Sequence, residues 1–374
     1  MVFDKVPWLT VSGYGAHIKS TPTQLIIQRK GEVQNYPLRG VHHLVIAGGH
    51  TIHTSAITNI LKAGGAISFL DQDSNPVGFL HPPMRHPDEE IKAIQKLAPA
   101  HRYALAIATG AIRERMVRLE RIAEASAPMV PVQRGPSPPE LSRYSPEGPL
   151  PPWTSPDQFR GAPTPLNSSG SFGPVAPSDP GLPAGPQILY KGELEFLHTS
   201  LGELEFLVKL DEIRRLFSLS TDMYYEILSR TLPPDLGFRR RTRRPHLDPV
   251  NAMLSFGYAM LFSQCMRAVC GANLDPDLGM LHEGTGSLVY DLIEPLKPAM
   301  VDDAVFELAR RGLHEGDFEY GDRRCHLSEG LVERLLSRLY VSVKGEEIDG
   351  MVARFREALM QNCPFIVPEL DRAR

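Results

Sequence analysis

The sequence lacks the features that mark membrane and secreted proteins. No apolar run reaches the roughly 20 residues that a transmembrane helix needs. The N-terminus has no basic segment followed by an apolar stretch, so no signal peptide is expected. The four cysteines include no Cys-x-x-Cys pair, and Cys265 and Cys270 fall in a predicted helix as small core residues. We therefore expect a reduced, cytoplasmic protein that does not bind membranes.

An overall excess of positive charge is also missing. The formal net charge is −4, so the molecule as a whole is not a polycation. Any binding to nucleic acid must then come from a local patch of positive side chains. The chain has 374 residues, which is enough for two domains and more than one core normally covers.

Residues 1–86 have the pattern of a small β-rich domain. Apolar and polar residues alternate through the first forty residues, and turn formers interrupt them at Ser12–Gly13 and Lys30–Gly31. This alternation predicts strands. A short helix that ends in glycine is predicted at 55–65, between two further strand patterns.

Histidines are frequent in this β-rich domain. Their spacing is compatible with a metal site, but histidines on strand and loop surfaces are the commoner case, and we interpret them as surface residues. The Gly48–Gly49 pair is interpreted as a turn, because no GxxxxGK pattern follows it. The histidines concerned are His42, His43, His50 and His53.

Residues 87–374 change to a helical period. Apolar residues repeat at spacings of three and four, which predicts an α-helical domain. The pattern is interrupted at 128–186, where 17 of 59 residues are proline. Such a composition buries too little apolar surface to offset the entropy of ordering, so we expect a disordered insertion, either a passive linker or a segment that binds a partner domain. The predicted fold class is α+β, with a β-rich domain followed by an all-α domain.

Three candidate ligands for a metal ion lie close together in the sequence. Asp291 and Glu294 are three residues apart on a predicted helix, so both carboxylates share one face. Two adjacent carboxylates repel unless one is protonated or a cation lies between them. His282 precedes the helix in a loop that is able to reach the same ion, and this donor set suits Mg²⁺ or Mn²⁺. The alternative is a solvated helix face with an unrelated loop histidine.

A dense arginine cluster precedes these residues. Arginine binds phosphate through a planar fork of donors, and a cluster in a chain of negative net charge is typical of a site for a nucleic-acid backbone. Carboxylates beside such a strip point to metal-assisted phosphoryl transfer. The alternative is a solvated basic loop. The arginine strip consists of Arg239, Arg240, Arg241, Arg243 and Arg244.

The region around these groups closely resembles the core of the CRISPR-associated adaptation integrase family. That family has an arginine-rich stretch, an Asp-Pro-x-Asn motif and a Leu-Ser-x-Gly-Tyr helix. Gly-x-Leu-His and Ser-Leu-x-x-Asp-Leu-x-Glu follow. The segment 36–80 also resembles the family's strand, helix and strand region. The matching motif residues are Asp248, Pro249, Asn251, Leu254, Ser255, Gly257, Tyr258, Gly279, Leu281, His282, Ser287, Leu288, Asp291, Leu292 and Glu294.

The resemblance implies a fold, a reaction and partners. It implies an N-terminal β-sandwich-like domain that dimerises and a helical catalytic domain. The homodimer is expected to assemble with the second Cas adaptation protein. The reaction is transesterification, in which the 3′-hydroxyl of a captured DNA fragment attacks a phosphodiester at the CRISPR repeat. Members are also nucleases that depend on Mg²⁺ or Mn²⁺.

The resemblance also assigns roles to residues. His282 and Glu294 match the family's metal ligands, and Asp291 matches the adjacent acidic position, so all three are candidate catalytic residues. The arginine strip matches a region expected to contact DNA.

One position departs from the family pattern. A glutamate ligand is expected in a motif like Ile-Glu-Gly-x-Ala-Ala-x-x-Tyr-Phe, and alignment on Tyr224 and Tyr225 puts Phe217 at that position. Phenylalanine cannot bind a metal ion. Asp222 and Glu226 are rotated away from Phe217 along the helix, and Glu212 is a third option if the helix begins late; none is a clean replacement.

Three functions are compatible with this sequence. The leading hypothesis is an active, metal-dependent DNA endonuclease and integrase of CRISPR adaptation. The second is a catalytically weakened paralogue that binds DNA or acts as a scaffold, which Phe217 favours. The third is an integrase of a mobile element, which shares the same chemistry.

Overall fold

A computed structural model describes residues 8–82, 89–126, 189–242, 246–321 and 324–370. The predicted proline-rich insertion at 128–186 lies outside these ranges, as do Arg243 and Arg244 of the arginine strip. By their contacts, the described residues belong to a single unit.

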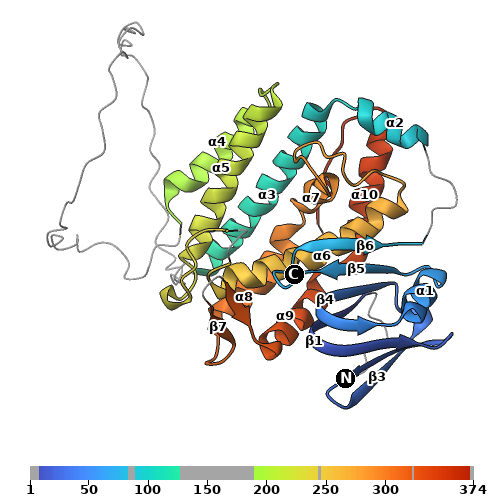
Figure 1. Ribbon diagram of the computed structural model, residues 1–374. Helices are drawn as coiled ribbons and strands as arrows, with labels where there is room; N and C mark the ends of the chain where they lie inside the picture. The colour runs from blue at the N-terminus through green and yellow to red at the C-terminus, as the bar shows by residue number, and fades with distance from the viewer. Residues whose placement is uncertain (1–7, 83–88, 127–188, 243–245, 322–323, 371–374) are drawn as a thin grey trace, which may run out of the picture. The chain divides into compact units, whose positions relative to one another are not determined.

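The N-terminal part folds as one six-stranded mixed sheet with the order β3-β2-β1-β4-β5-β6 (Figure 1). β1 and β4 run parallel at its centre, β4 and β5 are also parallel, and the remaining pairs are antiparallel. The strands are β1 (Leu9–Ser20), β2 (Gln24–Arg29), β3 (Glu32–Pro37), β4 (His43–Ile52), β5 (Ala66–Leu70) and β6 (Pro76–Leu80).

The two faces of this sheet pack against different partners. Leu44 and Ile46 share a core with Ile60 of the helix α1 (Thr54–Lys62). Val45 and Ala47 point to the other face and join the core of the helical region. This follows from the strand period of two residues. The predicted helix at 55–65 is therefore confirmed, and it covers one face of the sheet.

The remainder of the chain is mostly helical, and the predicted α+β class is confirmed. The helical pattern predicted from residue 87 onward begins with two helices that are separated at Pro99, which cannot continue the first helix. The helices are α2 (Glu89–Leu97), α3 (Ala100–Ser126), α4 (Lys191–Leu204), α5 (Leu210–Ser229), α6 (Pro249–Gly271), α7 (Ser287–Ile293), α8 (Asp303–Arg310), α9 (Glu329–Ser342) and α10 (Gly345–Met360), with a π-helical segment η3 (Pro298–Asp302) before α8 and the short 3₁₀ segments η1 (Leu38–Gly40) and η2 (Pro234–Leu236).

Helix α6 is the central element, because most of its residues are buried on all sides. It begins at a strong cap, where the Asp248 side chain accepts a hydrogen bond from the Asn251 backbone N–H at 2.7 Å and Pro249 occupies the first turn. Cys265 and Cys270 are buried on this helix, as the sequence predicts. α6 also contacts β4, β5 and β6, so the same helix supports the sheet and the candidate site.

Some local features were not expected. The strands β7 (Phe318–Tyr320) and β8 (Cys325–Leu327) form a small hairpin within the helical region. Gly48 and Gly49 lie inside β4, so the predicted turn at this pair is wrong. Among the described residues, no helix is long and apolar enough to cross a membrane.

His43 corrects the interpretation of the histidine cluster. Its ring is fully buried, whereas His42 and His53 are exposed and His50 is half-buried. Gln264 of α6 donates a hydrogen bond to its Nδ1 at 2.9 Å, so its Nε2 donates to the Ser68 hydroxyl at 2.8 Å. The ring is therefore a buried link between the sheet and α6.

Candidate active site

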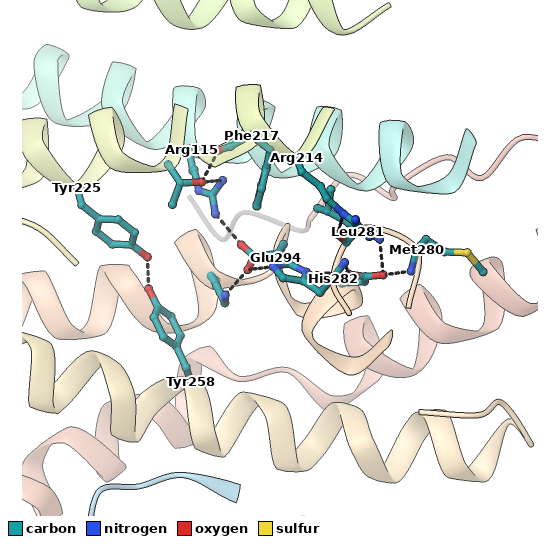
Figure 2. Close-up of polar contacts among 12 residues, drawn as sticks. Arg115, Arg214, Phe217, Tyr225, Tyr258, Met280, Leu281, His282 and Glu294 are labelled. Carbon is teal, nitrogen blue, oxygen red and sulfur yellow. Dashed lines mark hydrogen bonds and ion pairs between the residues drawn. The ribbon is translucent and has the colours of Figure 1, made fainter. Parts of the chain in front are cut away.

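A pocket of about 620 Å³ lies where α3, α5, α6 and α7 meet. The wall from α5 includes Phe217 and Tyr225, and the wall from α6 includes Tyr258. His282 and Glu294 line the opposite side, from the loop before α7 and from the end of that helix (Figure 2). The pocket therefore contains two of the three predicted metal ligands, together with Phe217, the position that departs from the family pattern.

Asp291 holds the loop that carries His282. Its carboxylate is fully buried and accepts backbone N–H groups from Met280 at 2.5 Å, Leu281 at 3.0 Å and His282 at 2.8 Å. It also receives the His282 Nδ1 at 2.8 Å. A carboxylate is only an acceptor, so Nδ1 carries the proton and Nε2 is left facing the pocket.

Glu294 is held between two positive side chains. Arg115 of α3 donates to its Oε2 at 2.7 Å, and Lys297 contacts its Oε1. Burial by itself would raise the pKa of Glu294, but the charges of Lys297 and Arg115 lower it to about 2. Glu294 is therefore a carboxylate under all ordinary conditions.

The two carboxylates do not meet at one point. Asp291 lies on the Nδ1 edge of the imidazole, and Glu294 Oε1 lies 3.8 Å from Nε2 on the other edge. The sequence predicts a shared ion for both, but both oxygens of Asp291 already accept N–H groups. Within the part of the chain that the structure describes, no three His, Cys, Asp or Glu side chains form a group that could hold a metal ion.

Phe217, where the sequence resemblance predicts a glutamate ligand, lies beside His282. Its ring meets His282 edge to face, with centroids 6.1 Å apart. The Arg115 guanidinium lies 4.9 Å from the centre of the same ring. An aromatic ring and two cations therefore surround His282 and Glu294, and these residues do not fit a resident divalent cation.

None of the alternative carboxylates replaces this ligand. Asp222 lines the pocket but is exposed. Glu226 lies 3.5 Å from Arg230, and Glu212 lies 3.5 Å from Lys209, both in exposed ion pairs. The α5 helix thus supplies no buried carboxylate to the corner at Phe217.

The arginine strip divides into residues with different surroundings. Arg239 and Arg240 are exposed, as a DNA-contacting strip requires. Arg241 turns inward, where it donates to Asn251 Oδ1 at 3.0 Å and Ser255 Oγ at 2.8 Å and lies against the Tyr258 ring. It lines the pocket, so the strip leads from the surface to the site.

Arg115 and Lys297 are site residues that the sequence reasoning did not single out. Arg115 is an arginine in a helix with a buried apolar face, and nothing local distinguishes it from a surface residue. Lys297 was detectable, because its spacing of three from Glu294 is that of a helical ion pair.

Tyrosine hydroxyls form a chain beneath the pocket wall. The hydroxyls of Tyr225 and Tyr258 are 2.5 Å apart, and Tyr258 also donates to Asp302 of the π-helical segment. Tyr224 donates to the other oxygen of Asp302 at 2.7 Å. This buried network fixes the α5 and α6 walls relative to each other.

The fold agrees with comparisons to known proteins. The family model described as CRISPR associated protein Cas1 matches residues 9–128 and 187–340. The chain belongs to the Cas1 family. A CRISPR-associated endonuclease Cas1 of Methanospirillum hungatei JF-1 is 35% identical over 358 residues, which is 96% of this chain and 99% of that relative.

Solved structures share the Cas1 fold. A casposase bound to an integration product superposes with a TM-score of 0.73 at 17% identity, covering 98% of this chain and 96% of that one. A chain of a Cas6-RT-Cas1–Cas2 complex gives a TM-score of 0.70 at 17% identity, covering 98% of this chain and 37% of that one. The Cas1 match includes Arg115 in its first part and Phe217, His282 and Glu294 in its second.

Proposed function

We propose that this protein is a DNA-binding subunit of CRISPR adaptation whose own metal-dependent strand transfer is weakened. The observation that carries the proposal is Phe217, which packs against His282 and Arg115 where a third ligand is expected. Membership of the Cas1 family supports the adaptation role. The relative from Methanospirillum is named an endonuclease, which supports action on nucleic acid.

The proposed partners are DNA, a second copy of the chain and the second Cas adaptation protein. A fold neighbour is part of a Cas6-RT-Cas1–Cas2 complex, and another is a casposase bound to an integration product. These neighbours support an assembly on DNA. In the proposed arrangement, residues 1–86 provide the dimer contact and residues 87–374 act on DNA.

The side chains have distinct proposed roles. Arg239 and Arg240 contact the DNA backbone from the surface. His282 presents Nε2 toward a phosphodiester and a 3′-hydroxyl, and Asp291 is a positioning residue that holds the imidazole and its loop. Glu294 keeps Arg115 and Lys297 in place in the pocket.

A second candidate is the active, Mg²⁺- or Mn²⁺-dependent endonuclease and integrase. The arrangement of His282 favours it, because Asp291 fixes Nδ1 and leaves Nε2 within 3.8 Å of Glu294. Phe217 argues against this candidate, because it stands where a glutamate ligand is expected and cannot bind a metal ion.

Strand transfer by the Phe217→Glu variant separates the two candidates. A labelled duplex with a 3′-hydroxyl, a repeat-containing target, the second Cas protein and Mn²⁺ would be supplied. We expect the wild type to transfer slowly and Phe217→Glu to be at least about tenfold faster, since losing even an outer-shell partner of a metal site typically costs about 10- to 100-fold in affinity or activity. Phe217→Leu is the matched control and should behave as the wild type.

DNA affinity measured alongside completes the test. Equal affinity of all three proteins with faster transfer only by Phe217→Glu supports the weakened enzyme. Rapid transfer by the wild type that Phe217→Glu does not improve would favour the active integrase instead.

A further inference from the structure

We infer that the pocket binds a phosphate group of DNA directly through fixed positive side chains, without a resident divalent cation. The inference rests on the proposed function and names what the same pocket holds. The positive groups that carry it are Lys297, Arg241 and Arg115, all of which line the pocket. Arg214 also lines it but is paired with Glu283 at 2.6 Å.

The first step concerns the acidic side of the pocket. Both oxygens of Glu294 are engaged, one with Arg115 at 2.7 Å and the other with Lys297. A divalent cation at His282 and Glu294 would lie beside these two positive charges without a further carboxylate free to bind it, because both oxygens of Asp291 accept N–H groups and Glu283 pairs with Arg214 at 2.6 Å. Like charges in a largely buried site repel strongly, so the pocket disfavours a bound cation.

The second step concerns the corner of the pocket at Phe217, which carries no charge. An ordinary metal site here would receive a negative charge from α5, but Phe217 supplies none. Glu294 is shared between two cations, and the other carboxylates of the lining, Asp222 and Glu283, are exposed to solvent. Four positive side chains of the lining therefore face three negative ones, and Asp291, behind His282, does not line the pocket.

The third step concerns Arg241 and Lys297, which lie on the Tyr258 ring. Their charged groups are 5.3 Å and 5.0 Å from its centroid, respectively. Arg241 is held by neutral acceptors, Asn251 Oδ1 at 3.0 Å and Ser255 Oγ at 2.8 Å, which do not neutralise its charge. Two positive groups are thus fixed on one wall before DNA arrives, which lowers the cost of ordering them on binding.

A negatively charged phosphodiester is the group that this charge pattern accepts. Arginine and lysine at fixed positions bind phosphate strongly in partly desolvated sites. The exposed Arg239 and Arg240 continue from Arg241 along the chain, so a DNA strand on the surface arrives beside the pocket. DNA binding should therefore be independent of divalent cations.

The experiment uses the full chain and two direct binding measurements. Mn²⁺ binding is followed by the loss of the electron paramagnetic resonance signal of free Mn²⁺. DNA binding is followed by fluorescence anisotropy of a labelled duplex with a 3′ overhang, in EDTA and then in Mn²⁺. We expect the wild type to show no saturable Mn²⁺ site up to about 1 mM and to bind DNA equally in both conditions.

Variants assign the effect to the pocket. Lys297→Met should weaken DNA binding in EDTA by about tenfold and reduce the salt slope of the affinity by about one. Lys297→Arg preserves the charge and should retain most of the affinity, and circular dichroism checks that both variants are folded. Lys62→Met, an exposed lysine on α1, is the matched control and should leave DNA affinity unchanged. Phe217→Glu should gain a Mn²⁺ site.

Different results would overturn different statements. A saturable Mn²⁺ site in the wild type, or DNA affinity that falls tenfold in EDTA, would overturn the inference and leave the DNA-binding role intact. DNA binding that Lys297→Met does not change would overturn the pocket as the phosphate site. Failure of the wild type to bind DNA under any condition would overturn the proposed function itself.

Discussion

Asp291 is the residue on which the geometry of His282 depends. One carboxylate receives three backbone N–H groups and an imidazole N–H, all in a fully buried position. A loop with so many donors directed at one point has no other way to satisfy them. Its short side chain therefore sets both the path of the loop and the nitrogen that His282 shows to the pocket.

Replacing Asp291 by asparagine should destabilise the protein by about 2–4 kcal/mol, because an amide brings N–H groups toward donors that need an acceptor. Denaturant unfolding measures this cost. NMR of labelled His282 should show that the imidazole no longer holds its proton only on Nδ1, since the carboxylate that accepts this proton is gone. Asp211→Asn, at an exposed position on α5, should change stability by less than about 0.5 kcal/mol. A His282 ring that still holds its proton only on Nδ1 would refute the positioning role.

Phe217 shows how far residue-level reasoning can reach. Alignment on Tyr224 and Tyr225 predicts a substituted ligand position at Phe217, and the structure places this ring beside His282. The sequence could not reveal Arg115, because its contact with Glu294 joins residues 179 positions apart in the sequence. It also could not show that Asp291 points away from Glu294. A spacing of three residues places both side chains on one helix face, but it does not reveal which loop packs against each carboxylate.

At the scale of elements, α6 meets its neighbours at very short range. A Cβ at Gly257 would lie 2.5 Å from Val301 Cγ1 in the π-helical segment. The absent side chain is therefore what allows α6 and η3 to approach, and it explains the glycine in the Leu-Ser-x-Gly-Tyr motif.

Gly257→Ala should destabilise the protein by about 1–3 kcal/mol through overpacking, although alanine is the better helix former by about 1 kcal/mol. Gly350→Ala is the matched control, because it lies within α10 and its Cβ would meet nothing within 4 Å. That control should be neutral or stabilising by up to about 1 kcal/mol. Thermal unfolding of both variants tests the pair, and equal stabilisation by the two would exclude the packing explanation.

The elements themselves were largely predictable from periodicity. The strands, α1 and the helical period of the second part were confirmed, because most of their apolar residues repeat with the period of a strand or a helix. The β7–β8 hairpin was missed because its three-residue strands are too short to show any alternation. Gly48 was misread as a turn: it adopts a φ of 108° within β4, where a Cβ would strike the carbonyl of Gly13 in the neighbouring strand.

At the scale of the whole molecule, His43 joins the sheet to α6 through one buried ring. Burial lowers its pKa and the charge of Arg267 adds to this effect, so the pKa falls from 6.5 to about 4. Folding therefore requires a neutral imidazole. The unfolded chain takes up this proton below pH 6.5 and the folded chain only near pH 4, so stability from this group is complete above pH 6.5 and is lost as the pH falls toward 4.

The expected loss between these pH values is about 3 kcal/mol. His43→Gln cannot take up the proton, so its stability should fall by correspondingly less over the same range, even if it is lower at pH 8. His101→Gln, at an exposed position on α3, is the control and should follow the wild-type curve. Urea unfolding at several pH values provides the measurement, and parallel curves for His43→Gln and the wild type would contradict the assignment.

The placement of α3 and α4 has a practical consequence. α3 ends at Ser126 and α4 begins at Lys191, and both pack against α5. The residues that pack between these helices hold the two parts of the polypeptide together, in addition to the peptide chain that connects them. Two fragments divided within 127–188 should consequently reassemble when they are produced side by side, losing only the effective concentration that a covalent tether provides. The protein would then serve as a two-piece reporter whose pocket forms only when both pieces are present.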